Sequence, residues 1–382
     1  MISGFRRPRS RIAKVPEGPG QSSETGHEPC SIETTTPTHN GRLTMLDLKL
    51  GARGAAFATA VALTSAGSLA AQEFGWDMPN EYGETTTVAQ SDQVFSEMLF
   101  ERSDGRIQIT HHFGGSLGLR SIDHWASVED GAVPLASTFA GVLTGIDPIF
   151  FLNAMPFLAT NPMESLTLID AARAQYSNAF EESGQILLFA EPWVPVGIWA
   201  DRLIETPEDL EGLRIRTSDL NGSLIMEAVG ASPIQMTWGD VVPALATNTI
   251  DSVLTSGVPG LQSNFQDYLD HFHDVGFVLT TNMVHMNRDV FDSLPEDLQQ
   301  IVLETAAATE AQVWATAAAD LGMTPPMFEA AGVTLVSEFS PELMSTLREA
   351  ASPILEEWRS IMPDGVADQI LERYEELLAE SQ

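Results

Sequence analysis

The sequence has one cysteine and very little lysine. Cys30 lies in the N-terminal 71 residues, and so do both lysines, Lys14 and Lys49. The rest of the chain can therefore form no disulfide, and it offers no thiol nucleophile or thiolate metal ligand. From Gln72 onward, 11 arginines stand against 48 carboxylates, which gives this part a net charge near −37. Such a field repels phosphates and anionic headgroups, so nucleic acid and membrane surfaces are disfavoured as partners.

The sequence also lacks an apolar run long enough to cross a membrane. The apolar segment at 55–66 follows basic residues and precedes the small residues SLAA at 68–71, a pattern typical of a secretory signal peptide. A signal peptide normally begins at the initiator, so we expect Met45 to be the true start and residues 45–71 to be the signal. Residues 1–44 are then a disordered extension or a wrongly assigned start. The mature chain is expected in the periplasm.

Helical patterns alternate with short β-like runs after the signal. These runs are GRIQITHHF, AVPLAST, QILLFAEPW, GLRIRTS, ASPIQM and DSVLTS. The alternation predicts an α/β protein with mostly parallel sheets covered by helices, and the length indicates two domains. Residues 294–323 predict a single helix, which at 1.5 Å per residue would be about 40 Å long. A helix of that length could run along both domains.

Patterns that indicate catalysis are few. The segment GGSLG at 114–118 matches the nucleophile-elbow pattern, so a secreted serine hydrolase that uses Ser116 remains an alternative. A glycine-rich turn after a strand explains the same residues without catalysis. His271 and His273 could bind a metal from one strand face, but no third ligand stands at a familiar spacing. We therefore expect no enzyme activity, no cofactor and no metal.

Two arginines stand two residues apart in the segment DLEGLRIRTSD at 209–219. A guanidinium group matches a carboxylate with parallel N–H donors and keeps its charge when it is enclosed. Arg214 and Arg216 would share a face of a strand, so alternation alone does not choose between them. Both could instead form ion pairs with nearby acidic side chains such as Glu205 or Glu208, or with Glu211.

Four segments, in this order, resemble the DctP-type substrate-binding proteins of TRAP transporters. They are GRIQITHHFGGSLG, DPIFFLNAMPFLAT, ETPEDLEGLRIRTSDLNGSLIMEAVGASPIQMTWGDVVPALATNTIDSVLTS and LPEDLQQIVLE. The similarity extends from about Phe74 to Tyr374. It implies a protein that captures a small organic acid in an interdomain cleft and delivers it to the membrane subunits of a TRAP carrier. It implies no reaction of the protein's own.

The resemblance also implies a type II-like periplasmic binding protein of two α/β domains. We expect domain I at 72–193 plus 281–320, and domain II at 194–280 plus 321–382, which includes the C-terminal helices. Strands should cross between the domains near 193–196 and 280–284, and the long helix should span both domains. A monomer is expected, with a dimer left open.

The same resemblance assigns the ligand's carboxylate to Arg216 and a surface ion pair to Arg214. The ligand-binding candidates are Arg216, Trp238, Thr255, Trp193, Phe157, Ser137 and Asp240. Thr255 stands where many members of the family have asparagine, which leaves the ligand open. If the ligand is a small amine or zwitterion, Asp240 or Glu191 would supply the counter-charge.

Overall fold

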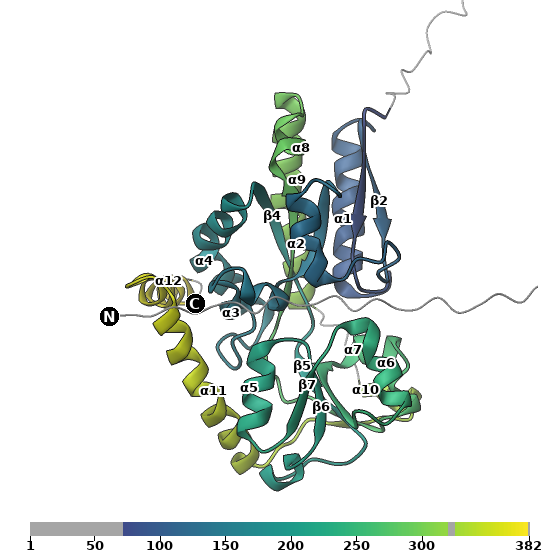
Figure 1. Cartoon of the computed structure of the whole chain (residues 1–382), viewed down its shortest axis with the longest axis vertical. Coiled ribbons are helices and arrows are strands. Elements are labelled where there is room, and N and C mark those ends of the chain that lie inside the picture. Colours follow the sequence, from purple (N-terminus) through teal and green to yellow (C-terminus); the bar gives the residue numbers. More distant parts are fainter. Residues whose placement is uncertain (1–71, 320–324, 381–382) are drawn as a thin grey trace, which may run out of the picture. The chain divides into compact units, whose positions relative to one another are not determined.

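The computed structural model describes residues 72–319 and 325–380, which lie in one compact unit at 66–382. The predicted extension and signal peptide lie outside the described residues. Within this unit the strands form three sheets, which we assign to two lobes (Figure 1). No helix in the described part of the chain is both long and apolar enough to span a membrane.

The first lobe contains two sheets. β1 (Phe74–Pro79) and β2 (Ile107–His112) pair in parallel, and an antiparallel sheet has the order β3-β10-β4. The strands of the antiparallel sheet are β3 (Leu135–Phe139), β10 (Thr281–Asn287) and β4 (Gln185–Pro192). The helices of this lobe are α1 (Thr87–Arg102), α2 (Ser121–Glu129), η1 (Ala140–Gly145), α3 (Phe150–Asn153), α4 (Pro162–Glu182), α8 (Arg288–Asp292) and α9 (Glu296–Ala319).

The second lobe contains one six-stranded sheet in the order β11-β9-β5-β8-β6-β7. Its strands are β5 (Val196–Ala200), β6 (Arg214–Thr217), β7 (Ser232–Gln235), β8 (Ser252–Ser256), β9 (His271–His273) and β11 (Thr334–Val336). Its helices are η2 (Pro207–Leu210), α5 (Leu220–Ala228), α6 (Trp238–Ala246), α7 (Gly257–Gln262), η3 (Phe265–Asp267), α10 (Pro325–Ala330) and α11 (Pro341–Ile361). The last helix, α12 (Val366–Glu380), follows α11.

The chain crosses between the lobes twice, once at the predicted residues and once just before the predicted segment at 280–284. β4 continues through residues 193–195 into β5, and residues 274–280 connect β9 to β10. The two connections lie side by side, because the backbone N–H of Trp193 donates to the carbonyl of Thr280 (3.0 Å) and that of Val196 to the carbonyl of Val278 (2.8 Å). These hydrogen bonds hold the connections together as a pair.

The sheets are less parallel than the sequence predicted. β10 is antiparallel to both of its neighbours, β3 and β4, and β5 is antiparallel to both β8 and β9. β5 and β10 are the strands that follow the two crossings. They enter their sheets from the other lobe, in the opposite direction to strands that are connected by a helix within one lobe. The strand-helix alternation could not reveal this.

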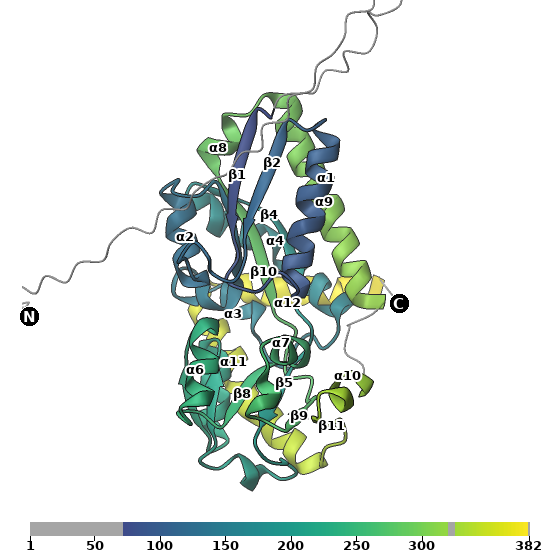
Figure 2. The same cartoon turned by 90° about the vertical axis from the view of Figure 1, so that its right-hand side faces the viewer.

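The long helix α9 packs on the first lobe, against α1, α4 and β4, and Figure 2 shows it beside α1. Its buried Leu298, Val302 and Ala306 share a core cluster with residues of α1 and β10, and the indole of Trp314 donates to the carbonyl of Ala190 (2.8 Å). The expectation that this helix spans both domains is therefore corrected, because its apolar face matches one lobe.

At the C-terminus, α11 packs on α5 and η2 of the second lobe, whereas α12 packs on α4 of the first. The residue boundaries of the domains stay a prediction.

Candidate ligand-binding site

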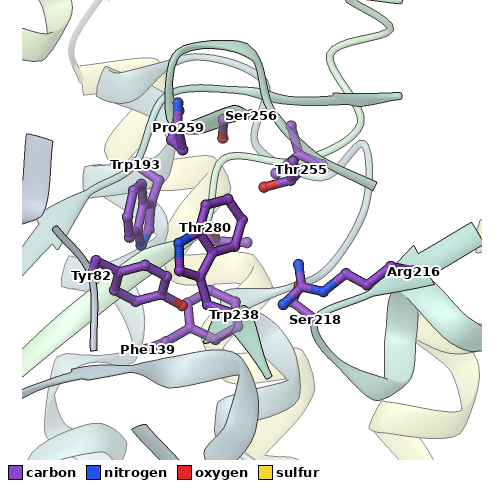
Figure 3. A pocket seen from close by; sticks show the side chains of 11 residues that line it. Tyr82, Phe139, Trp193, Arg216, Ser218, Trp238, Thr255, Ser256, Pro259 and Thr280 are labelled. Atoms are coloured by element: carbon purple, nitrogen blue, oxygen red, sulfur yellow. The ribbon is translucent and has the colours of Figure 1, made fainter. Parts of the chain in front are cut away.

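A cavity lies between the lobes beside the two crossings. It consists of an inner hollow of about 30 Å³ and an adjoining outer hollow of about 340 Å³. Both are lined by Tyr82 and Phe139 of the first lobe and by Arg216, Ser218 and Trp238 of the second (Figure 3). The inner hollow is also lined by Trp193, Val196, Thr255, Ser256, Pro259 and Thr280. Space enclosed by two lobes in this way suits a small molecule.

Arg216 places an enclosed positive charge in this cavity. It lies on β6 and is only 3% exposed. Its Nε and Nη2 donate to one carbonyl, that of Met236, at 3.1 and 2.9 Å, and its guanidinium lies 5.7 Å from the centre of the Trp238 ring. No carboxylate of the described residues lies within ion-pair distance of it. Burial lowers the pKa of Arg216, but an arginine keeps its proton in such surroundings.

Arg214, two residues earlier, has a different environment. Its Nε pairs with Oδ2 of Asp251 (2.9 Å), its Nη1 donates to the carbonyl of Asn248 (2.6 Å), and its side chain is 45% exposed. The expected surface ion pair is present, with Asp251 as the partner instead of the acidic residues at 205–211. The reason is that Asp251 directly precedes β8, the strand that pairs with β6. The two arginines therefore differ in their partners: Arg214 pairs with a carboxylate, whereas Arg216 donates to a backbone carbonyl.

Aromatic side chains form much of the cavity wall. Tyr82 and Trp193 pack edge to face with ring centres 4.6 Å apart, and Tyr82 lies 5.9 Å from Trp238. Figure 3 shows Trp238 between Arg216 on one side and these two rings on the other. Burial, with the negative charge of Glu81, raises the pKa of the Tyr82 phenol, so this hydroxyl stays neutral. The wall can contact the carbon skeleton of a ligand.

Glu81 brings a negative charge to the outer hollow and joins the two lobes. Its Oε2 accepts from the backbone N–H of Ser121 (2.9 Å) at the start of α2, and its Oε1 accepts from the N–H of Trp238 (3.1 Å) at the start of α6. Helix N-termini favour negative charge, so both helices stabilise the carboxylate. The cavity is thus lined by one enclosed cation and one carboxylate.

The structure brings together four of the predicted site residues and separates the other three. Arg216, Trp238, Thr255 and Trp193 all line the inner hollow. Phe157, Ser137 and Asp240 do not line either hollow.

Each of these three side chains is used elsewhere. Phe157 packs on Phe277 with ring centres 5.4 Å apart. Ser137 is fully buried within the first lobe. Asp240 is half exposed and pairs with Arg120 across the lobes at 3.1 Å. Glu191, the other suggested counter-charge for an amine, is fully buried outside the cavity lining.

Sequence reasoning missed several cavity residues, chiefly Glu81, Tyr82, Phe139 and Ser218. All four follow or end strands: β1 ends at Pro79, β3 ends at Phe139, and β6 ends at Thr217. Ligands of α/β proteins bind outside the carboxyl ends of strands. This rule could have identified the four residues from the sequence, but only if the ends of the strands had been known.

The described residues form no catalytic triad around Ser116, which a serine hydrolase would need. This residue is exposed in the turn after β2, and its hydroxyl has no hydrogen bond to a histidine in the described structure. The nearby His111 bonds to Ser96, and His112 bonds to Asp77. The residues at 72–319 and 325–380 also contain no group of three side chains placed to hold a metal ion.

Comparison with known proteins places this geometry in a family. Residues 80–360 match the family described as bacterial extracellular solute-binding protein, family 7. The chain is 26% identical to the ectoine/5-hydroxyectoine-binding periplasmic protein UehA of Ruegeria pomeroyi, over 79% of this chain and 89% of that protein. It is 28% identical to the ectoine-binding periplasmic protein TeaA of Halomonas elongata, over 63% and 71% of the two chains.

A solved structure agrees with these relatives. The fold is similar, with a TM-score of 0.75 and 25% identity, to DctP6, an extracytoplasmic solute receptor of Bordetella pertussis that binds pyroglutamic acid. The match covers 79% of this chain and 99% of that one. It supports the predicted two-domain α/β binding-protein fold. The chain belongs to family 7 of the bacterial extracellular solute-binding proteins, the DctP-type solute receptors of TRAP transporters.

Proposed function

We propose that this protein captures a small organic acid in the cavity between its lobes and delivers it to the membrane subunits of a TRAP carrier. The observation that carries the proposal is Arg216, a buried cation without a carboxylate partner among the described residues. Enclosing an unpaired charge is costly, and a ligand carboxylate would supply the missing partner. The guanidinium donors not used by Met236 can bind it through paired hydrogen bonds.

The relatives are consistent with a ligand of this kind. Two are named for ectoine and one for pyroglutamic acid. Both compounds are small rings with one carboxylate, and both are of a size that suits an outer hollow of about 340 Å³. An aromatic wall beside one arginine supports the capture of a small ring acid more than that of a long flexible chain.

The test is a thermal-shift comparison of pyroglutamate with its uncharged primary amide. The two differ only in the group that should meet Arg216. A ligand at 100 times its dissociation constant stabilises the folded state by about 2.7 kcal/mol, so binding should raise the unfolding temperature clearly. We expect the acid or a related ring acid to raise it and the amide to have no effect. Equal shifts for acid and amide would contradict the proposal.

A zwitterion is the second candidate, and Glu81 favours it. Its carboxylate lines the same cavity as Arg216, and the rings of Tyr82 and Trp193 can face a delocalised cation. Ectoine has both charges, whereas pyroglutamate has only the negative one. Glu81→Gln also turns one acceptor of the backbone N–H groups of Ser121 and Trp238 into a donor, so it should weaken both ligands, and ectoine more than pyroglutamate. The reverse result would exclude the zwitterion.

We further propose that the chain acts in the periplasm as a monomer without turnover. The signal-like segment at 45–71 supports export, and N-terminal sequencing of the exported protein should find a start near Ala71 or Gln72. Retention of residues 2–44 would contradict this. Light scattering that shows a dimer would correct the oligomeric state, and chemical change of a bound acid would contradict a receptor role.

A further inference from the structure

A buried polar cluster lies next to the aromatic wall of the cavity. Its five side chains come from separate segments of the first lobe and are each 0% exposed. They are Asn80, Asp92, Ser137, Glu191 and Asn282. Such a cluster is costly to bury unless its hydrogen bonds are complete.

Each side-chain nitrogen and oxygen of the cluster has at least one hydrogen-bond partner, except one oxygen of each carboxyl group. The Ser137 hydroxyl donates to Oε1 of Glu191 (2.6 Å) and accepts from Nδ2 of Asn282 (2.9 Å). Nδ2 of Asn80 donates to Oδ2 of Asp92 (2.7 Å). Oε2 of Glu191 and Oδ1 of Asp92 are buried and have no hydrogen-bond partner in the described structure. We call Asp92 and Glu191 the acid pair.

A proton would complete this arrangement. No cation of the described residues lies within ion-pair distance of the acid pair, and two carboxylates in one buried site each disfavour the charge of the other. Burial raises the pKa of both groups, and the charge of Asp92 adds to the effect on Glu191. The Ser137 hydrogen is donated to Glu191, so a protonated carboxyl group would supply the hydrogen that the free oxygens lack.

Few other titratable groups surround the acid pair. Tyr82 follows β1, His285 on β10 bonds to other side chains, and Glu310 of α9 pairs with Arg173 at 2.9 Å. None of them forms a hydrogen bond or ion pair with the acid pair among the described contacts. A change in its protonation is therefore governed by the pair itself.

Each member of the acid pair is connected to one aromatic wall of the cavity through an asparagine. Oδ1 of Asn282 accepts from the Trp193 indole (2.8 Å), and Asn282 also bonds to Ser137, the partner of Glu191. Oδ1 of Asn80, the partner of Asp92, accepts from the backbone N–H of Tyr82 (2.8 Å). Trp193 and Tyr82 are the rings that pack edge to face in the cavity.

We propose that Asp92 and Glu191 share a proton and, through Asn80 and Asn282, position Tyr82 and Trp193 for ligand capture. Neither acid touches the ligand, so both are positioning residues. The inference rests on the function proposed above, because it places a ligand against these rings. Loss of the proton at alkaline pH charges the dry cluster, displaces the rings and weakens binding.

The test compares amide variants of the full-length protein across pH. Glu191→Gln and Asp92→Asn keep the shape of the side chains and supply a permanent N–H. Glu97→Gln, an exposed site on the same helix as Asp92, is the matched control. Calorimetry with pyroglutamate and ectoine should show that the wild type and the control lose affinity about tenfold or more at alkaline pH. Glu191→Gln should bind as well as the wild type at neutral pH and keep that affinity when the pH rises.

A second readout needs no ligand. Infrared spectroscopy at neutral pH should show the carbonyl stretch of protonated carboxylic acids in the wild type, and its amplitude should fall in Glu191→Gln but not in Glu97→Gln. Trp193 emission, identified by difference from Trp193→Phe, should change at alkaline pH in the wild type and not in Glu191→Gln.

The outcomes separate this inference from the proposed function. If neither compound binds the wild type, the proposed ligand class fails, and the two ligand-free readouts still decide on the acid pair. The inference is overturned if the protonated band is absent from the wild type, or if Glu191→Gln keeps the wild-type dependence on pH in affinity or emission.

Discussion

Replacing Arg216 is the perturbation that tests the proposed site most directly. Arg216 is 3% exposed, donates twice to the Met236 carbonyl and has no carboxylate partner in the described structure. In Arg216→Ala, a ligand carboxylate that enters the closed cavity would meet aromatic rings and no cation. The same substitution removes a buried, unpaired charge from the free protein. Ligand capture should therefore fail while the fold persists.

The magnitude follows from the burial of the pair. Removing one partner of an enclosed ion pair costs about 3 to 5 kcal/mol, because the other charge stays buried and uncompensated. A loss of that size is roughly two to three and a half decades in the dissociation constant. Arg216→Lys should also bind poorly, because an ammonium group cannot reproduce the parallel N–H donors of a guanidinium.

Arg214→Ala is the matched control, two residues away on the same strand. Its side chain is 45% exposed, against 14% for Asp251, and it lies outside the cavity lining, so its loss should change stability by about 1 kcal/mol and affinity very little. Calorimetry on the three variants, with one acid that the wild type binds, measures all of these effects. Equal losses at both positions would refute the assignment, and full affinity in Arg216→Ala would mean that the ligand has no carboxylate at this point.

Three further outcomes are expected. A bound acid should reduce the radius of gyration in small-angle scattering, because it contacts both lobes and draws them together, as the bond of Glu81 to the start of α6 does; an unchanged curve at saturation would contradict closure. Asp240→Asn should weaken binding less than about tenfold, because its pair with Arg120 is half exposed; a larger loss would give this contact a greater role. Burial lowers the pKa of His124 to about 4 and of His285 to about 3, whereas an unfolded histidine takes up its proton near pH 6.5. These histidines should therefore lower the free energy of unfolding as the pH drops from about 6.5 to 4, so in urea titrations His285→Gln should lose less stability over this range than the wild type, by a few kcal/mol; equal losses would exclude this.

The sequence predicted the parts of the site that depend on one continuous segment. β6 with its two arginines, the start of α6 at Trp238 and the end of β8 at Thr255 are local features, and the structure brings them to one cavity. The crossings were expected near 193–196 and 280–284, and the structure has them at 193–195 and 274–280. The strands and the helix start follow from local patterns, whereas the assignment of Arg216, Trp238 and Thr255 to the ligand followed from the family resemblance.

What could not be predicted depends on side-chain direction and on packing between lobes. Asp240 lies in the first turn of α6, yet it points to Arg120. Glu81 reaches the cavity because two helix N-termini, far apart in the sequence, meet around it. The helix α9 supports one lobe because its apolar residues match that lobe's core. These contacts join residues that are far apart in the sequence, so no local sequence pattern predicts them.

The acidity of the chain sets a final condition on an organic-acid ligand. An excess of carboxylates, near −37 from Gln72 onward, repels an anion that approaches the cleft, while Arg216 attracts it only at close range inside a dry site. Salt at physiological strength screens exposed charges beyond about 8 Å and screens a buried pair much less. Added sodium chloride should therefore speed the association of pyroglutamate, which is the reverse of ordinary ion pairing. Ectoine, with no net charge, should respond little. Stopped-flow association rates at matched osmolarity would show the difference, and a slower capture of pyroglutamate in salt would mean that attraction to exposed cations guides it instead.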